Sequence, residues 1–317
     1  MSEDSKKEIL AGVDRPLRIG TRQSPLALAQ ARMTANALLS FHGWRPDQVE
    51  LVPMIASGDK ILDRSLAEVG GKALWTKELD RALGTGEIDC AVHSMKDVET
   101  IRPGAFILAA MLDRADIHDR LIGADSIEAL PKGAVVGTAS PRRKAQLLRE
   151  RHDLDIRLIR GNVQTRLQKI EDREYDATLL AAAGLNRLDM EDVGIDISDQ
   201  VMLPAPAQGA VGVESRTDDG HVRRLLRAIS STNTFRAVTA ERLFLERLTA
   251  DCHSPVAALA TIDGTMVHLR AEILLPDGSE HVAGESSFET GDVSAPRILA
   301  DKLVGQASAD LKAVFGR

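Results

Sequence analysis

The sequence predicts an α/β fold with two related domains built on mainly parallel sheets and a smaller α+β domain at the C-terminal end. Apolar strand-like runs alternate with helix-like segments over the first two thirds of the chain, a pattern typical of parallel sheets covered by helices. One strand-turn-helix pattern occurs twice, which indicates two similar domains. Of the 317 residues, 44% are hydrophobic and only 3% aromatic, so Ala, Val, Ile and Leu must fill the cores.

The repeated pattern is an apolar strand, a Ser-Pro step and a helix. In the first copy, "LRIGTRQSPLALAQ", Ser24 suits the N-cap and Pro25 the first helical position. In the second copy, "AVVGTASPRRKAQLL", Ser140 and Pro141 occupy the same positions. We therefore expect two equivalent strand-to-helix turns, one in each α/β domain.

The other elements follow in chain order. Residues 88–98 ("IDCAVHSMKDV") predict a buried strand that ends in polar residues, and 202–216 ("MLPAPAQGAVGVESR") a crossover that returns the chain to the first domain. Turn residues after 232 predict hairpins. The remaining expected elements are a strand at 49–57, a helix opening within 69–86, strand-helix pairs at 155–170 and 175–188, a helix at 235–248, hairpin turns at 263–264 and 276–278, and a last helix from about Pro296.

These elements predict the domain limits. The first domain comprises 15–112 and 208–229, the second 113–207, and the third 230–317.

Charge and composition restrict the partners. A net charge of -7 disfavours a polyanionic partner, so no nucleic acid is expected. The polar start and the lack of any run of about 18 apolar residues predict a cytoplasmic protein without membrane contact. Cys90 and Cys252 lie far apart, with no second Cys or spaced His pair nearby, so neither a disulfide nor a metal site is expected. Nothing indicates an obligate partner chain, so we expect a monomer.

Several cations stand where predicted strands give way to helices. Ligands bind at this edge of parallel sheets, because helix N-termini point amide donors outward there. Arg142 and Arg143 fall in the first turn of a helix, where the macrodipole disfavours cations, so we expect an anion to compensate them. The cations at such points are Arg22, Lys72, Arg142, Arg143, Arg160 and Arg166. Because arginine binds carboxylate or phosphate through paired hydrogen bonds, this set predicts a cleft for a ligand with several negative groups.

The competing interpretation is that such arginines are solvated surface charges paired with nearby acids. It applies best to Arg149, Arg151 and Arg157, which lie within the helix or beyond it. The nearest acids are Glu150, Asp153 and Asp155. No Walker-type phosphate loop is present in the sequence, so nucleotide hydrolysis is not indicated.

The polar end of the 88–98 strand is a second candidate site. Asp97 could perform acid-base or charge-stabilising work, although a lone aspartate after a strand is more often a helix cap or a paired surface charge. The arginine-bearing turns expected at the same edge favour the chemical role. Lys96 could pair with Asp97 or bind an anion, His93 is first a structural hydrogen-bonding histidine, and Cys90 is a small buried hydrophobe.

Cys252 lies in a short polar loop, "TADCHSP", after a helix and before a predicted strand. It could be a nucleophile, a metal ligand, a packed thiol or an attachment point. His253 is a weak candidate base, because sequence neighbours rarely present their side chains to each other as a dyad. An exposed loop thiol with neither base nor metal could still be a covalent anchor.

The motifs together resemble the porphobilinogen deaminase (hydroxymethylbilane synthase) family over nearly the whole chain. The similar segments are "LRIGTRQSPLALAQ", "GDKILD", "GGKALWTKELD", "DCAVHSMKD", "GTASPRR", "RGNVQTRL", "LAAAGLNRL", "PAPAQGAVGVE" and "AERLFLERLTADCHSP". The resemblance implies two α/β domains with the topology of bi-lobed binding proteins, an active-site cleft between them, and an α+β domain whose loop cysteine projects into the cleft.

The resemblance also implies a reaction and a cofactor. Porphobilinogen units are joined head to tail with loss of ammonia to give a linear tetrapyrrole, and the chain grows on a dipyrromethane attached through a thioether. It implies Cys252 as the anchor and Asp97 as the catalytic carboxylate, which would stabilise the electron-poor species left when ammonia departs. Acetate and propionate groups on each pyrrole would explain the arginines.

The remaining roles also come from the resemblance. Cofactor carboxylates would be held by Ser94, Lys96, Asp97, Thr138, Ser140, Arg142 and Arg143. Substrate would be held by Arg22, Ser24, Arg160 and Arg166. The segment from Gly58 to Lys77 would be mobile. Small residues, often Gly-Gly, usually precede the anchor cysteine in this family, whereas Ala250 and Asp251 do so here, and an acidic neighbour should disfavour the thiolate and tighten the loop.

The alternative from another class is a bi-lobed anion-binding protein without catalysis, which the first two domains alone would permit. That alternative predicts no covalent adduct and does not account for Cys252. A cysteine-dependent hydrolase would need a base for this thiol, and the sequence supplies no convincing one.

Overall fold

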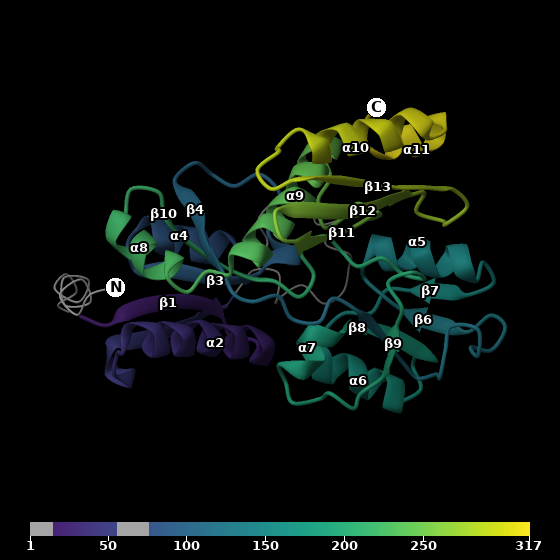
Figure 1. Ribbon diagram of the computed structural model, residues 1–317. Coiled ribbons are helices and arrows are strands. Elements are labelled where there is room, and N and C mark those ends of the chain that lie inside the picture. The colour runs from purple at the N-terminus through teal and green to yellow at the C-terminus, as the bar shows by residue number, and fades with distance from the viewer. Residues whose placement is uncertain (1–14, 56–75) are drawn as a thin grey trace. The chain divides into compact units, whose positions relative to one another are not determined.

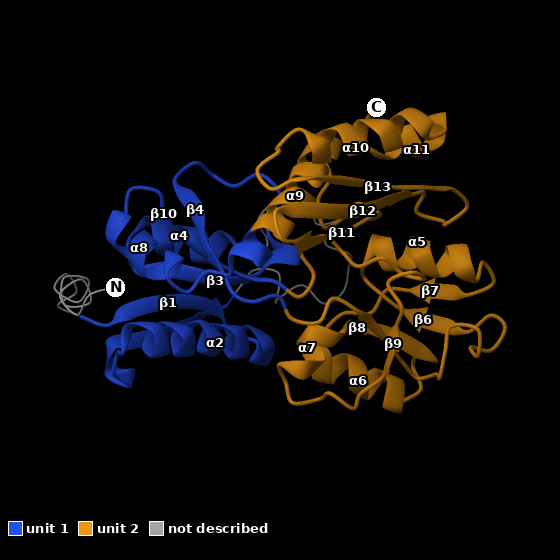
Figure 2. Cartoon of the chain, in the orientation of Figure 1, with its two compact units in different colours: residues 1–60, 72–114, 210–235 blue, residues 61–71, 115–209, 236–317 orange. Residues whose placement is uncertain are grey.

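The structure is a computed structural model in which residues 15–55 and 76–317 are described. These residues form two compact units, coloured separately in Figure 2. Unit 1 contains the described residues up to 114 together with 210–235, and unit 2 contains 115–209 and 236–317. Unit 1 is therefore built from segments that are separated in the sequence by most of unit 2.

Unit 1 holds a five-stranded sheet, which we call sheet 1. Its strands, in spatial order, are β2 (Val49–Met54), β1 (Leu17–Arg22), β3 (Cys90–Ser94), β10 (Val211–Arg216) and β4 (Phe106–Met111). The first three pair in parallel, and β10 runs antiparallel to both of its neighbours. Four of the five strands thus point the same way, with β10 as the reversed strand.

Helices α2 (Pro25–His42) and α4 (Lys77–Gly84) of unit 1 lie where the sequence predicts helices, whereas α8 (Gly220–Arg227) was not predicted. Ser24 caps α2 by accepting a hydrogen bond from the amide of Ala27, and Pro25 takes the first helical position. The apolar side of α2 packs on β1, beside which it lies in Figure 1, and shares a core with Leu17 and Ile19. Short 3-10 turns lie at Pro46–Gln48 and Met95–Asp97.

Unit 2 contains a second five-stranded sheet, sheet 2, with the same plan as sheet 1. Its strands, in spatial order, are β7 (Asp155–Arg157), β6 (Val135–Gly137), β8 (Ala177–Ala181), β5 (Asp119–Ile122) and β9 (Ile195–Ile197). Again the first three pair in parallel, and the fourth runs antiparallel to its neighbours. The predicted relationship between the two α/β domains is therefore visible in the strand order.

Three helices follow the parallel strands of sheet 2. They are α5 (Pro141–Glu150), α6 (Val163–Glu171) and α7 (Ala182–Asn186). Ser140 caps α5 by accepting from the amide of Arg143, which repeats the arrangement at α2. Asn162 caps α6 by accepting from the amide of Thr165.

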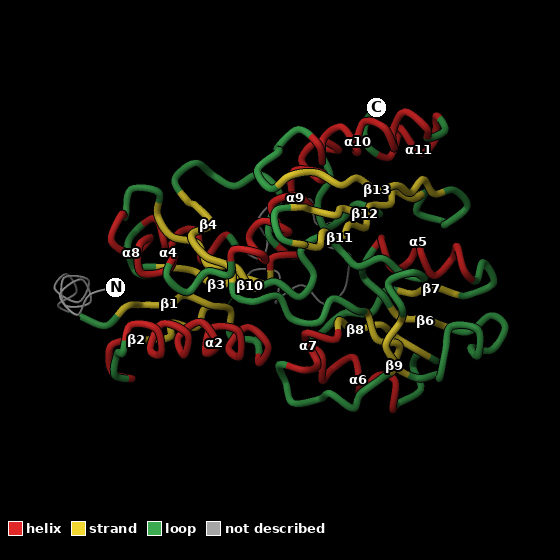
Figure 3. The backbone as a smooth tube through the Cα atoms, in the orientation of Figure 1, coloured by secondary structure: helices red, strands yellow, loops and turns green. Residues whose placement is uncertain are grey.

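The C-terminal region is a three-stranded antiparallel sheet with helices, traced in Figure 3, and it belongs to unit 2 except for the first four residues of its first helix. Its elements are α9 (Thr232–Leu248), β11 (Val256–Asp263), β12 (Met266–Leu274), β13 (His281–Glu289), α10 (Ala295–Gln306) and α11 (Ala309–Val314). These helices and strands share one apolar core, in which Phe244 is fully buried. This is the predicted α+β region with its two hairpins.

The α+β region packs directly on α5 and on the segment that contains Leu203 and Pro204, within unit 2. At the β12–β13 turn Gly278 has a φ of +75°, and a Cβ there would lie 2.5 Å from the amide nitrogen of Arg149 in α5. The amide of Ala258 donates to the carbonyl of Pro204, and Leu203 packs against Leu259. The region that carries Cys252 and helix α5, whose first turn contains Arg142, consequently belong to the same compact unit.

The predicted fold class is confirmed, with two refinements. Each largely parallel sheet contains one reversed strand, and β7 ends at Arg157, so Arg160 lies three residues beyond the strand that it was expected to end. The three-domain limits stay a prediction. Lys72 and most of the segment expected to be mobile, 58–75, lie outside the described residues. Among the described helices none is long and apolar enough to cross a membrane.

Candidate functional site

The carboxyl ends of the parallel strands in sheet 2 gather the expected anion-binding residues of unit 2. Thr138 and Ser140 follow β6, and Arg142 and Arg143 open α5. The reversed strand β5 begins at this same edge, because Asp119, its first residue, pairs with Ala181, the last residue of β8. Sheet topology thus brings a carboxylate to the two arginines at the edge where ligands bind in such folds.

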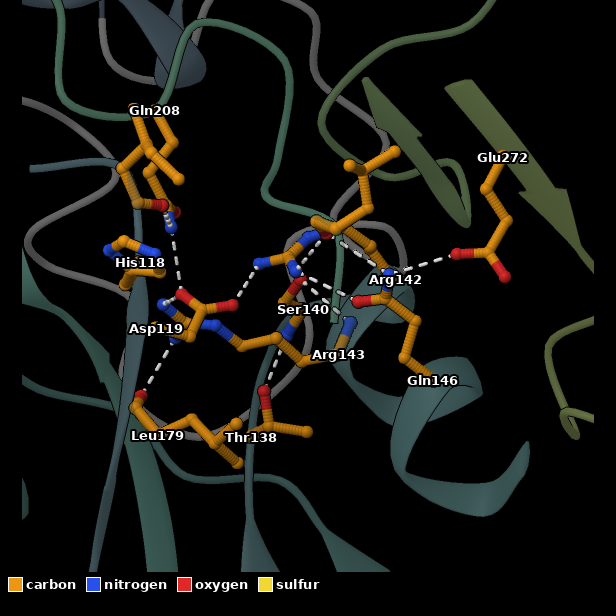
Figure 4. Close-up of polar contacts among 12 residues, drawn as sticks. His118, Asp119, Thr138, Ser140, Arg142, Arg143, Gln146, Leu179, Gln208 and Glu272 are labelled. Atoms are coloured by element: carbon orange, nitrogen blue, oxygen red, sulfur yellow. Dashed lines mark hydrogen bonds and ion pairs between the residues drawn. The ribbon is translucent and has the colours of Figure 1, made fainter. Parts of the chain in front are cut away.

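Asp119 forms a buried ion pair with both arginines (Figure 4). One carboxylate oxygen accepts from Arg142 Nη2 at 2.7 Å, and the other accepts from Arg143 Nη2 at 2.7 Å. The second terminal nitrogen of Arg142 donates to the carbonyl of Leu203, and that of Arg143 to the carbonyl of Leu179. The anion expected to compensate these arginines is, in part, a side chain of the protein.

The arginine pair still has unused binding capacity. The Nε atoms of Arg142 and Arg143 are buried and have no hydrogen-bond partner among the described residues. Two guanidinium charges face one Asp119 carboxylate, so these three groups carry a net charge of +1. Burial lowers the pKa of Arg142 despite the attraction of Asp119, and the adjacent charge of Arg143 lowers it further. An anion bound here would relieve this imbalance.

Neutral side chains surround the pair. Gln208 donates to the Asp119 carboxylate at 2.9 Å, and Gln146 donates to Glu272 of β12 at 3.0 Å. The hydroxyl of Thr138 accepts from the amide of Ser140 at 3.1 Å and shapes the turn before α5. The arginines therefore sit in a network that reaches from sheet 2 to the α+β region.

The other two arginines predicted in unit 2 lie after β7. Arg160 is partly buried, and burial lowers its pKa. Arg166 lies in the first turn of α6, where its Nε donates to the carbonyl of Gly161. Arg160 therefore lies in the loop between β7 and α6, and Arg166 lies near the start of α6.

The arginines interpreted as surface charges pair with the acids named in advance. Arg149 contacts Glu150, Arg151 contacts Asp153, and Arg157 contacts Asp155. Arg149 additionally pairs with Glu272. The interpretation as a solvated surface charge fits Arg157, whose side chain is 58% exposed. It does not fit Arg149, whose side chain is only 18% exposed and also pairs with the buried Glu272.

In unit 1 the carboxyl ends of β1 and β3 lie at one edge of sheet 1. Arg22 ends β1, Ser94 ends β3, and the two strands pair in parallel. Ser94 exchanges hydrogen bonds with the amide group of Gln30 on α2, the helix that Ser24 caps. Ser94 is therefore in contact with α2, and Arg22 ends the strand that pairs with β3.

Asp97 ends the 3-10 turn that follows β3 and is half-buried, as is Lys96 beside it. The turn is held by Met95, whose amide donates to the carbonyl of Ala210 and whose side chain is 1% exposed. Met95 lies over Gly212 of β10, where a Cβ would overlap its sulfur. Backbone pairing and close packing thus fix the segment that carries Asp97.

A second buried ion network lies behind this turn. Glu214 of β10 is fully buried, accepts two hydrogen bonds of 2.9 Å from Arg102, and lies 3.1 Å from His93 Nε2. Arg102 also pairs with Asp80 and Glu99. Burial raises the pKa of Asp80. These contacts match the structural role expected for His93.

Cys252 is exposed at a tight turn after α9, whereas Cys90 is buried in β3 and burial raises the pKa of its thiol. The Asp251 carboxylate accepts from the amide of His253 at 2.8 Å, and the Ser254 hydroxyl accepts from the amide of Asp251 at 3.2 Å. Asp251 therefore closes the turn with its side chain, in the way that aspartate commonly stabilises turns. The expectation that it tightens the loop agrees with this geometry.

Some relevant residues were missed from the sequence. Asp119 opens β5, a strand that the sequence analysis did not predict, and its partners lie 23 and 24 residues away. Gln208 lies in the crossover motif "PAPAQGAVGVE" without an obvious role. Arg187 follows α7, and burial lowers its pKa to about 10, while its Nε is buried with no partner among the described residues. Arg187 is a further candidate for anion binding in unit 2.

Comparisons with known proteins cover nearly the whole chain. The family model "Porphobilinogen deaminase, dipyromethane cofactor binding domain" matches residues 17–224, and "Porphobilinogen deaminase, C-terminal domain" matches 235–305. The porphobilinogen deaminase of Sphingopyxis alaskensis is 54% identical over 313 residues, covering 96% of this chain and 98% of the relative. That of Paracoccus denitrificans is 48% identical over 299 residues, covering 93% and 96%.

Among solved structures, the VFT2 domain of BvgS from Bordetella pertussis aligns with 76% of this chain and 97% of its own, at 12% identity and a TM-score of 0.42. A periplasmic substrate-binding protein of an ABC transporter from Coxiella burnetii aligns with 69% of this chain and 94% of its own, at 13% identity and a TM-score of 0.42. The extent and identity of the sequence matches decide the assignment: the chain belongs to the porphobilinogen deaminase family.

Proposed function

We propose a division of roles for the porphobilinogen deaminase reaction in this chain. Cys252 carries the dipyrromethane, and Asp97 is the catalytic carboxylate. Ser94, Lys96, Asp97, Thr138, Ser140, Arg142 and Arg143 hold the cofactor, and Arg22, Ser24, Arg160 and Arg166 hold the substrate. The single observation that carries the proposal is the buried, incompletely compensated arginine pair of a family whose substrate is a carboxylated pyrrole.

The residues of unit 2 fit a carboxylated cofactor. The orphaned Nε donors of Arg142 and Arg143 and the net positive charge of their cluster favour a carboxylate partner. Cys252 is an exposed thiol, as an anchor for a thioether must be. When bound, the dipyrromethane supplies the pyrrole carbon onto which the first substrate unit is joined. An enzyme of this family accounts for Cys252, which a non-catalytic anion-binding protein would not.

Asp97 would act on the substrate. Loss of ammonia from porphobilinogen leaves positive charge on the pyrrole, and a carboxylate that accepts from the pyrrole N-H stabilises that charge. The same carboxylate can hold the proton that leaves the attacking pyrrole carbon. Its turn is anchored by Met95 and Ser94, so the group needs little reorganisation during the reaction.

Intact mass is the first test. Purified, denatured protein should weigh more than the polypeptide by one dipyrromethane, and Cys252→Ala should remove the extra mass. A wild-type mass equal to that of the bare chain, even after incubation with porphobilinogen, would refute the proposal.

Turnover tests Asp97. Asp97→Asn should reduce kcat by at least about a hundredfold while the circular dichroism spectrum and the cofactor mass persist, since the amide keeps the shape and loses the charge. Near-normal kcat would remove Asp97 from the catalytic role.

Elongation tests the arginines. Arg160→Leu should slow incorporation of porphobilinogen far more than Arg151→Leu, which removes a guanidinium that pairs with Asp153 and neighbouring carbonyls. Equal and small effects would mean that Arg160 is an ordinary surface charge.

We also propose that the protein acts as a cytoplasmic monomer without nucleic acid. The net charge of -7 supports the absence of a nucleic-acid partner. Light scattering on a sizing column measures the oligomeric state, and a dimer mass would contradict the proposal.

A further inference from the structure

Asp119 holds a position that the family reaction alone does not explain. Its side chain is fully buried and receives donors from two separate chain segments: Arg142 and Arg143 at the start of α5, and Gln208 in the crossover before β10. We propose that Asp119 is a positioning residue, which sets the two guanidinium groups to bind one carboxylate of the dipyrromethane cofactor. This inference rests on the proposed function of Arg142 and Arg143.

The hydrogen bonds show which donors of the two guanidinium groups are already used and which remain for a ligand. Each Asp119 oxygen takes one terminal nitrogen, and a backbone carbonyl takes the other terminal nitrogen of each arginine. Both guanidinium planes are thereby fixed at both ends. The donors left over in each fork include Nε, which has no partner among the described residues.

Charge explains why one carboxylate is suited to this place. Without Asp119, the guanidinium groups of two arginine residues that are 3% and 6% exposed would face each other in a buried site. Like charges in such a site repel each other strongly, so the two side chains would turn away from each other or become disordered. With Asp119 the cluster keeps one net positive charge, which matches a single ligand carboxylate.

Gln208 fixes the orientation of the carboxylate. Its amide nitrogen donates both to Asp119 and to the carbonyl of Ile117, at 2.9 and 2.8 Å. Gln208 is fully buried. Because Gln208 is neutral, it holds the Asp119 carboxylate in place without changing the net charge of the cluster.

The fold itself does not require an acid at this position. In sheet 1, Val211 opens the reversed strand opposite Ser94, as Asp119 opens β5 opposite Ala181. The same sheet plan is therefore built with an aliphatic residue in one unit and a carboxylate in the other. The carboxylate occurs in the unit in which Arg142 and Arg143 lie in the first turn of α5.

The test measures how fast the full-length chain acquires its cofactor. Protein purified without cofactor, from cells that make no porphobilinogen, is incubated with porphobilinogen and followed by intact mass. When the first unit attaches, a bond forms between Sγ of Cys252 and the aminomethyl carbon, the C-N bond breaks, and the thiol proton leaves with the amine as ammonia. Further units join by loss of ammonia in the same way.

Asp119→Asn should slow acquisition about tenfold, since one charge-assisted partner of each arginine is lost. Asp196→Asn is the matched control, because Asp196 pairs with Arg120 on the neighbouring strand and is half exposed. The control should acquire cofactor at the wild-type rate. In loaded protein, Asp119→Asn should raise KM more than it lowers kcat, a split that a general loss of stability would not produce.

Two outcomes would overturn the inference. One is a folded Asp119→Asn protein, with a lowered melting temperature or not, that acquires cofactor at the wild-type rate. If Asp119→Asn does not fold, Gln208→Ala decides, because it keeps both ion pairs: we expect acquisition about threefold slower, and a wild-type rate refutes the proposal. A wild-type chain that gains no mass would instead refute the proposed function.

Discussion

The reversed strands of the two related sheets place their buried carboxylates differently. In sheet 2 the acid is the first residue, Asp119, and the fourth residue is Ile122. In sheet 1 the first residue is Val211, and the acid is the fourth, Glu214. Alignment of Asp119 with Val211 through their partners on β8 and β3 also aligns Ile122 with Glu214.

This exchange of positions separates the ligand-positioning role that we propose for Asp119 from the structural role of Glu214. Asp119 lies at the carboxyl edge, beside the helix start that ligands approach. Glu214 lies three residues further along the strand, about 10 Å from that edge. It binds Arg102 and contacts His93 behind the Asp97 turn. An acid at the edge can balance ligand-binding arginines, whereas an acid within the sheet chiefly ties its elements together.

The comparison predicts the largest loss of stability at Glu214. Glu214→Ala leaves the Arg102 charge buried without its main partner, so the free energy of unfolding should fall by about 3 to 5 kcal/mol. Urea denaturation measures the change. A fall in the free energy of unfolding of less than about 1 kcal/mol would show that the Glu214 network does not stabilise the fold.

Low pH should remove the stabilisation that the ionised Glu214 carboxylate provides. Burial alone would raise the pKa of Glu214, but hydrogen bonding and ion pairing with His93 and Arg102 outweigh it and hold the pKa at about 2, below the ordinary value of 4.5. The stabilisation is therefore complete above about pH 5 and is lost as the pH falls toward 2. Between these limits the difference in unfolding free energy between wild type and Glu214→Gln should shrink by about 3 kcal/mol. A pH-independent difference in urea titrations would contradict this.

Gly212→Ala should have an intermediate effect. The added methyl group overlaps Met95, so the unfolding free energy should fall by about 1 to 3 kcal/mol as the turn shifts. Because this turn carries Asp97, kcat should fall as well. The matched change in sheet 2 is Arg120→Ala, since Arg120 aligns with Gly212. Arg120→Ala should not shift the turn that carries Asp97, so kcat should fall less than in Gly212→Ala. An equal loss of kcat would contradict the different roles of β5 and β10.

The smallest effects are expected where the two domains are most alike. Ser24→Ala and Ser140→Ala each remove one long capping bond of 3.4 Å, so each should cost about 0.5 to 1 kcal/mol of stability. Melting temperatures of the two variants measure this. A much larger loss for Ser140→Ala would mean that the two turns are not structurally equivalent.

Local signals in the sequence predicted much of this structure. Ser24 and Ser140 identified their helix starts, because capping involves residues only a few positions apart. Surface pairs such as Arg151 with Asp153 were also visible from spacing. The hairpin at Asp263 and Gly264 was likewise encoded locally.

The sequence could not reveal interactions formed only by the folded sheets. Glu214 and Arg102 are 112 residues apart, and Asp119 and Gln208 are 89 apart. Strand order brings these pairs together, and the reversal of β5 and β10 leaves no periodic signature. The strand that was expected to reach Arg160 ends at Arg157 because β6, its pairing partner, ends at Gly137.

The insertion of β10 between β3 and β4 has a consequence for the order in which the chain can fold during synthesis. Sheet 2 uses strands that lie between residues 119 and 197, all available before β10 is made. Sheet 1 lacks the strand that joins β3 to β4 until residue 216 has left the ribosome. The N-terminal sheet is thus completed after the central one, and the edges of β3 and β4 must wait unpaired through about a hundred residues of translation, several seconds at ordinary elongation rates.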